Sequence, residues 1–225
     1  NTNNIIKAQF ANAFRPPTFL ELYSRNNLVS DGNRNIVSET VNTREIGYIY
    51  QLSNFKYKVN VFYSDLSHII NVDENSKYGN IASAYSRGAE METEVPILPL
   101  LTVNGNVSYS YATDKTTSKE LAGSAKWLGN MAVLYQPLNN ITLALQNRYV
   151  GKIAREPYDS RLPLTGYYEM DFTLSYDHMP IKGLTFRSGI KNVFNANILE
   201  PNYQGFYYDN RRYPRQWWVQ LSYRF

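Results

Sequence analysis

The chain has 225 residues, and its 20 Tyr, 10 Phe and 3 Trp bring the aromatic content to 15%. The absence of cysteine excludes disulfide scaffolds and thiolate metal sites. A mild net charge of +4, with scattered Lys and Arg, does not indicate nucleic-acid binding. No apolar run reaches the roughly 18 residues of a transmembrane helix, and 43% hydrophobic residues are too many for a disordered chain.

Polar and apolar residues alternate along most of the chain, which is the period of a β-strand. In the last segment, for example, Trp217, Val219 and Leu221 lie on one face, and Trp218, Gln220 and Ser222 lie on the other. Most segments exceed the typical 5–6 residues of a soluble strand and reach the roughly 9–11 that cross a membrane. We predict ten antiparallel strands, at residues 4–13, 41–52, 55–70, 81–95, 101–112, 123–136, 141–151, 166–177, 183–194 and 213–225.

The predicted connections alternate in length along the chain. Short turns fall at 53–54, 96–100, 137–140 and 178–182, and longer loops near 14–40, 71–80, 113–122, 152–165 and 195–212. Outer-membrane barrels have short periplasmic turns and long extracellular loops. The pattern therefore predicts an all-β protein, an antiparallel transmembrane β-barrel in a bacterial outer membrane.

Six short motifs follow one another along nearly the whole chain. They are Ala13–Tyr23 (AFRPPTFLELY), Gly32–Thr40 (GNRNIVSET), Thr43–Gly47 (TREIG), Tyr85–Glu90 (YSRGAE), Gly189–Asn195 (GIKNVFN) and the aromatic-ended Tyr213–Phe225. In this order they resemble the FRAPT…EL, NPNLKPE, EIG, RGxE and GxxNLFD segments and the terminal strand of TonB-dependent outer-membrane receptors. The second is degenerate, because Arg34 and Ser38 stand where the family motif has proline.

The resemblance implies a barrel of about 22 strands that is filled by a plug domain. Residues 1–225 would then be the C-terminal part of the barrel, about ten strands, without the plug, the TonB box and the first barrel half. The implied partners are the TonB-ExbB-ExbD complex, the protein's own plug, outer-membrane lipid and lipopolysaccharide, and the barrel-assembly machinery. Phe225 resembles the terminal aromatic residue that this machinery reads as a sorting signal.

Glu90, Glu92 and Glu94 lie on one face of a predicted strand, about 6.6–6.8 Å apart in succession. Three like charges facing lipid would be costly, so we expect them to face the lumen. The resemblance implies that Glu90, Glu92 and also Glu45, in the EIG motif, contact arginines of the plug. The plainer alternative is neutralisation across the strand pair by two lysines, Lys56 and Lys58.

Aromatic residues and arginines gather in the two loops nearest the C-terminus. Such side chains suit flat, anionic ferric chelates through cation–π and charge-assisted contacts. The plainer alternative is an interfacial aromatic girdle with solvated loop charges. The candidate ligand-binding residues are Arg155, Tyr158, Tyr203, Tyr207, Arg211 and Arg212.

The resemblance predicts a receptor that imports a scarce nutrient, with a ferric siderophore or similar iron chelate as the leading substrate. Cobalamin, other metal chelates and oligosaccharides stay open, whereas haem is not favoured because residues 21–31 contain no histidine. We predict no catalytic residue, metal site, cofactor or nucleic-acid partner. The alternatives are a self-contained ten-stranded barrel, either porin-like or a surface protease, and a soluble β-sandwich adhesin.

Overall fold

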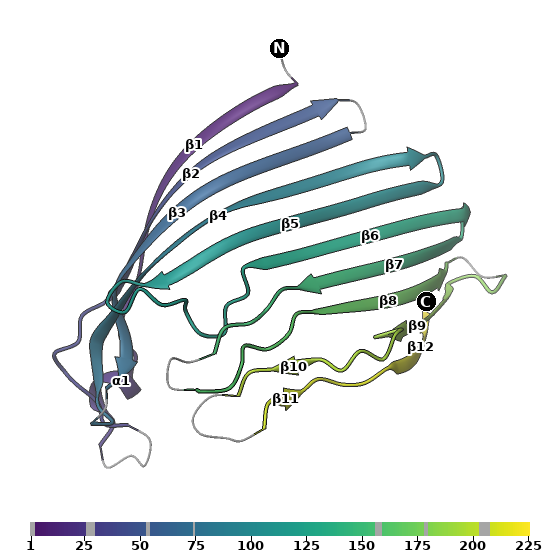
Figure 1. Cartoon of the computed structure of the whole chain (residues 1–225). Coiled ribbons are helices and arrows are strands. Elements are labelled where there is room, and N and C mark those ends of the chain that lie inside the picture. The colour runs from purple at the N-terminus through teal and green to yellow at the C-terminus, as the bar shows by residue number, and fades with distance from the viewer. Residues whose placement is uncertain are drawn as a thin grey trace.

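The computed structural model describes residues 3–25, 30–52, 55–73, 75–155, 159–177, 180–202 and 208–225. Within these ranges ten strands form a single antiparallel sheet, which curves into a trough-shaped wall (Figure 1). Nearly every strand pairs with its neighbour in sequence. The strands of the wall are β1 (Asn4–Arg15), β2 (Glu39–Leu52), β3 (Phe55–Val72), β4 (Tyr78–Leu98), β5 (Leu101–Asp114), β6 (Trp127–Leu138), β7 (Ile141–Val150), β8 (Tyr167–Tyr176), β9 (Leu184–Lys191) and β12 (Gln216–Tyr223).

The ten predicted strands are confirmed, but several of their ends differ. β3 and β4 extend their pairing to Val72 and Tyr78, so the predicted loop at 71–80 is reduced to a tight connection. β6 begins at Trp127 rather than at 123, because residues 121–126 make isolated loop contacts instead of a ladder.

Three short elements lie inside segments that the alternation predicts as loops. β10 (Leu199–Glu200) pairs with β11 (Asn210–Arg211). Helix α1 (Phe19–Tyr23) begins at Thr18, whose hydroxyl accepts the backbone N–H of Glu21 while the Glu21 carboxylate accepts that of Thr18. This reciprocal capping box satisfies two N–H groups that the first turn would otherwise leave unpaired.

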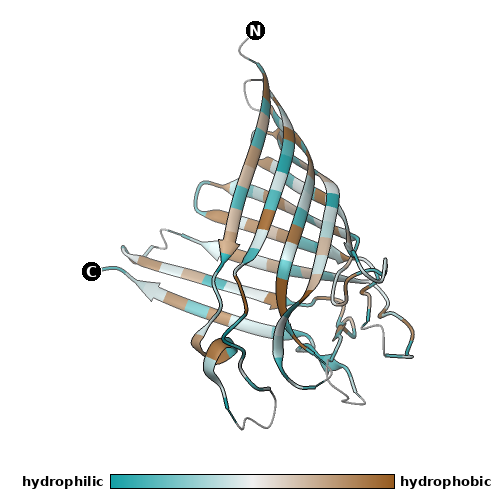
Figure 2. Cartoon of the chain, turned by 90° about the vertical axis from the view of Figure 1, so that its left-hand side faces the viewer, coloured by the Kyte–Doolittle hydropathy of each residue, from teal (hydrophilic) through white to brown (hydrophobic). Residues whose placement is uncertain are grey.

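The strand register sorts the side chains into lateral rows that alternate between polar and apolar (Figure 2). Because successive side chains of a strand point to opposite faces, neighbouring rows face opposite sides of the wall. One polar row faces inward and consists of Lys58, Glu92, Asn106, Asn130, Arg148 and Glu169. The next row faces outward and consists of Val59, Met91, Val107, Gly129, Tyr149 and Tyr168.

The buried apolar core is small and lies at the loop end of the wall. Its members among the described residues are Ile36, Ile70, Ala84, Ile153, Leu164 and Ile198. The outward apolar side chains of the strands are left uncovered: Ile46 is 59% exposed and Val219 70%. A contiguous apolar face of this size marks contact with another apolar phase. No helix among the described residues has the length and apolar character of a membrane span.

The sheet does not close on itself. In the described part of the chain, β1 pairs on one side only, with β2, and β12 on one side only, with β9. The expected alternative of a self-contained, closed ten-stranded barrel is therefore wrong. Each open edge presents unpaired backbone groups, which a membrane interior does not tolerate without partner strands.

Two glycines on the inner face make room for a ring on the neighbouring strand. A Cβ at Gly88, in the RGAE motif, would lie 2.1 Å from the Tyr109 carbonyl oxygen and 2.7 Å from the Phe62 ring. At Gly189, in the GIKNVFN motif, it would lie 2.8 Å from the Trp218 indole. Both motif glycines are therefore required by close packing of an aromatic side chain against the backbone.

Candidate functional site

The predicted acidic column, Glu90, Glu92 and Glu94, lies on the inner face of β4. Lys58 on β3 is directly opposite Glu92, and its Nζ donates to both carboxylate oxygens at 2.9 and 3.0 Å. Lys56 is opposite Glu94 in the register. Neutralisation across the strand pair is thus realised at Glu92, while Glu90 and Glu94 form no ion pair within the described residues.

Glu45, the remaining predicted plug contact, also faces inward. It lies on β2 between Gln9 and Phe62, is half-buried, and accepts a long hydrogen bond of 3.4 Å from the Asn60 amide. Asn60 is itself opposite Glu90. Glu45 and Glu90 are therefore two carboxylates on the same face with Asn60 between them, and neither is paired with a cation among the described residues.

Beside the acidic column, the inner face carries a strip of uncharged amides, which we call the amide strip. The Asn130 amide donates to the Asn106 Oδ1 at 3.0 Å, and the buried Asn104 Oδ1 has no hydrogen-bond partner. The strip borders a hollow of about 590 Å³. The members of the amide strip are Asn104, Asn106, Asn130 and Gln146.

Cations appear on the far side of the amide strip. Arg212, from the last loop, donates to Glu169 at 3.0 Å and lies 3.6 Å from Glu200, and Arg148 lies 4.0 Å from Glu169. Lys191 lines the same hollow. Across the wall, the inner face thus passes from acidic through neutral to mixed charge.

The first two sequence motifs are tied together by one arginine, in a cluster that we call the clasp: Arg15, Glu21 and Glu39. The Arg15 guanidinium donates to both oxygens of Glu39, at 2.6 and 2.8 Å, and to both oxygens of Glu21, at 3.1 Å each. The hydrogen bonds from Arg15 hold the pKa of Glu21 below its ordinary value. The clasp joins FRPPT…EL to the second motif, which ends on Glu39–Thr40, and so fixes the first loop onto the wall.

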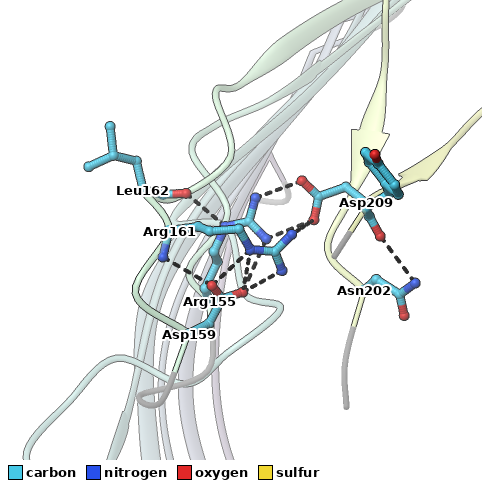
Figure 3. Close-up of polar contacts among 7 residues, drawn as sticks. Arg155, Asp159, Arg161, Leu162, Asn202 and Asp209 are labelled. Carbon is cyan, nitrogen blue, oxygen red and sulfur yellow. Dashed lines mark hydrogen bonds and ion pairs between the residues drawn. The ribbon is translucent and has the colours of Figure 1, made fainter. Parts of the chain in front are cut away.

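A second ion-pair cluster joins the two loops nearest the C-terminus, and we call it the loop latch: Arg155, Asp159, Arg161 and Asp209 (Figure 3). Arg155 forms a bidentate pair with Asp209, with both nitrogen–oxygen distances 2.7 Å, and its Nε donates to the Leu162 carbonyl at 2.7 Å. Arg161 pairs with Asp159 at 2.6 Å and reaches Asp209 at 3.5 Å. Only 6% of the Arg155 side chain and 12% of Asp209 are exposed.

The charges of the loop latch stabilise one another. Hydrogen bonds from Arg155 lower the pKa of Asp209, and those from Arg161 lower the pKa of Asp159. The pKa of Arg155 is raised in turn, first by its hydrogen bonds to Asp209. All four groups are therefore charged at neutral pH, and the latch holds the loop after β7 against the loop after β9.

The predicted ligand-binding residues divide into three groups. Arg155 and Arg212 are engaged with carboxylates of the protein. Arg211, at the end of β11, is exposed. Tyr158, Tyr203 and Tyr207 lie outside the described residues. Ligand binding by these side chains stays a prediction.

The sequence analysis missed the carboxylates of both clusters, Glu21, Glu39, Asp159 and Asp209. The signal available for them was weak: an acidic residue close to an arginine in a loop. Within the described residues no group of three or more His, Asp or Glu side chains is arranged to hold a metal ion. Phe225, the predicted assembly signal, is fully exposed on the outward side of the last strand.

A one-layer, curved antiparallel sheet with an apolar outer face and a polar inner face is a segment of the wall of a transmembrane β-barrel. The model of a family described as "TonB dependent receptor-like, beta-barrel" matches residues 1–193, and the chain belongs to this family. Among curated proteins, none matches the sequence.

Solved receptors share the fold at low sequence identity. A mutant of the ferric enterobactin receptor PfeA from Pseudomonas aeruginosa, in complex with enterobactin, has a TM-score of 0.84 and 19% identity, over 99% of this chain and 39% of the receptor. The ferric yersiniabactin uptake receptor FyuA from Yersinia pestis has a TM-score of 0.83 and 13% identity, over 99% and 35%. The ferric-catecholate import receptor Fiu from E. coli K12 has a TM-score of 0.78 and 19% identity, over 100% of this chain and 33% of the receptor. The chain thus spans between a third and two fifths of these receptors.

Proposed function

We propose that this chain is the C-terminal part of the barrel of a TonB-dependent receptor that imports an iron chelate across the bacterial outer membrane. One observation carries the proposal: the family match lies on a wall whose outer face suits lipid and whose inner face is polar. The two open edges support the presence of further barrel strands in the complete protein. Uptake would be driven by the TonB-ExbB-ExbD complex.

A ferric siderophore or similar iron chelate is the substrate class that the comparisons support best. The similar structures include receptors for ferric catecholates, ferric enterobactin and ferric yersiniabactin, and also a copper transporter. We propose that the loops next to the latch contact the chelate, with exposed Arg211 as the most available cation. A ligand that used Arg155 or Arg212 would first have to displace their carboxylate partners.

The inner face is the proposed contact surface of a plug domain. Glu45 and Glu90 are suited to receive plug arginines, because neither is neutralised by a cation in the described part of the chain. Glu92 would contribute less, since Lys58 already balances its charge. During assembly of the barrel, the barrel-assembly machinery would read the terminal strand and Phe225.

Growth under iron starvation tests the proposed function. Cells that lack the full-length protein would be supplied with ferric enterobactin, ferric yersiniabactin or, as a separate arm, copper. We expect growth on one ferric chelate to be lost and to return with the full-length protein, but not in matched cells that lack TonB. Equal growth on every chelate with and without the protein, or rescue that does not need TonB, would contradict the proposal.

The intact mass of the native polypeptide tests the proposed domain organisation independently. An outer-membrane species several-fold heavier than the 26.0 kDa of this chain is expected. A native species near 26 kDa would contradict the assignment of these strands to a larger barrel.

A further inference from the structure

Two arginines lie on the outward, apolar face of the wall. In the strand register, Tyr63 on β3 lies between Arg44 on β2 and Arg87 on β4. The row continues with Phe10 on β1 and Tyr111 on β5. Rings and cations therefore alternate across five strands, and we call Phe10, Arg44, Tyr63, Arg87 and Tyr111 the arginine row.

The arginine row lies in the upper part of the apolar band. From Arg44 to Leu52, at the turn end of β2, the strand runs for eight residues, or about 26 Å along its axis, which is roughly 18–21 Å along the barrel axis at a strand tilt of 35–45°. The outward side chains between them are Ile46, Tyr48 and Tyr50. The apolar band of an outer-membrane barrel is about 25 Å tall, so the row lies a few ångströms below the headgroups on the loop side, a distance that a long arginine side chain can span.

A lipid-facing arginine costs about 2–4 kcal/mol at the membrane midplane and close to nothing at the interface. The reach of their side chains to the nearby headgroups explains why Arg44 and Arg87 are tolerated, but not why two arginines lie two strands apart on the same face. Both side chains are exposed, and within the described residues neither forms an ion pair with a carboxylate. The Arg87 guanidinium lies 6.0 Å from the centre of the Tyr111 ring.

A shallow outward hollow of about 440 Å³ adjoins the row, lined by Phe10, Asn42, Arg44, Tyr63 and Asp65. The one carboxylate in this lining, Asp65, is paired with Lys115 and also lies within the field of Arg44. Two cations therefore face one carboxylate, which leaves one positive charge in the hollow for an external anion. On the far side of the row Lys126, 4.8 Å from the centre of the Tyr111 ring, is paired with Glu120.

We infer that the arginine row binds the phosphorylated headgroup of an outer-leaflet glycolipid, with Arg44 and Arg87 as the phosphate-binding residues. Their strands place the two Cα atoms about 9.5 Å apart. Both long side chains can thus reach one headgroup, while Phe10 and Tyr63 flank its acyl chains. Guanidinium suits phosphate because its planar fork donates two parallel hydrogen bonds. This inference rests on the proposed function, since it requires an outer-membrane barrel.

Titration of the delipidated full-length receptor with purified lipopolysaccharide, followed by native mass spectrometry, tests the inference. The double variant Arg44→Gln/Arg87→Gln, which we call the outward variant, removes both charges of the row. The matched control, Arg148→Gln/Arg187→Gln, removes the same charge from exposed arginines of the inner face. Near a membrane surface each cation contributes about fivefold in affinity, so the outward variant should bind about 25-fold more weakly and the control unchanged. Dephosphorylated lipopolysaccharide should bind wild type and outward variant alike.

Heat-modifiable gel mobility would verify folding of each variant, and Arg44→Lys/Arg87→Lys should recover most of the affinity. Unchanged affinity in the folded outward variant, an equal loss in the inner-face control, or a protein rather than a lipid retained by the row would overturn the inference. Growth on the ferric chelate, measured in the same strains, separates the two proposals. If wild type binds lipopolysaccharide through the row but imports no chelate, only the proposed function fails.

Discussion

The loop latch offers a sharp test, because its central pair can be removed without touching the strands. Arg155→Gln keeps most of the side-chain volume but loses the bidentate pair with Asp209. Asp209→Asn removes the opposite charge with almost no change in shape. Because the two residues are 54 positions apart in sequence, the pair holds two separate loops together. We predict that either change frees the loops while the wall stays intact.

The size of the effect follows from the geometry of the pair. Two hydrogen bonds of 2.7 Å join side chains that are 6% and 12% exposed, so solvent screening is limited. A hydrogen bond to a charged partner contributes about 1.5–3 kcal/mol, and Asp209 keeps a longer contact with Arg161 after the change. We therefore expect the free energy of local loop opening to fall by about 3 kcal/mol, which corresponds to a roughly hundredfold larger equilibrium constant for opening.

Amide hydrogen exchange of the full-length protein measures this opening directly. Amides that bond within the two loops, such as those of Ile153 and Leu164 in the first loop and of Arg212 in the second, should exchange about a hundredfold faster in either variant. Exchange in β5 should not change, and the neighbouring exposed Arg211→Gln should behave as wild type. The double variant Arg155→Gln/Asp209→Asn should speed exchange little more than either single change. Additive effects on the exchange rate, or unchanged protection in Arg155→Gln, would refute the latch.

Three further predictions concern other parts of the molecule. Because Arg155 and Arg161 lower the pKa values of Asp209 and Asp159, the latch should be fully formed at neutral pH and open as pH falls below about 4, where carboxylates protonate; opening already at pH 6 would contradict this assignment. In the full-length receptor, Glu90→Gln should loosen the plug and raise detergent-induced protease cleavage of it about tenfold, whereas Glu94→Gln, on the same face but with Lys56 rather than Asn60 opposite it, should not; equal effects would remove the specific role of Glu90. Gly88→Ala should prevent assembly, as judged by heat-modifiable mobility, because its Cβ meets the Tyr109 carbonyl at 2.1 Å, while Gly105→Ala, with no atom nearer than 3.7 Å, should assemble normally.

The strands were predictable because a wall one layer thick imposes a strict two-residue period. Each strand separates lipid from lumen along its whole length, so the alternation in segments such as Val103–Tyr111 is nearly uninterrupted. The ends at the loop side were harder to place. There the pairing of β3 with β4 shifts register between Leu66 and Ile69 and again at Ile70, so it continues to Val72 and Tyr78 without an alternating pattern.

The candidate site was predictable only where strand register decides it. The inward direction of Glu90 and its placement opposite the lysine-bearing strand follow from counting residues along a hairpin. The partner of Arg155 does not, because no local rule connects the loop after β7 with Asp209. Charged loop residues that sequence suggests for ligand binding can equally hold the loops together, and for Arg155 the observed contacts are of the second kind.

The location of the apolar core at the loop end also bears on how the protein is made. In water the outward side chains of the strands have nothing to pack against, so the wall cannot collapse into a stable aqueous intermediate. The loop end can, because Ile70, Ile153 and Ile198 are buried among the loops themselves. Stable packing in the absence of lipid is therefore confined to the loop end of this wall.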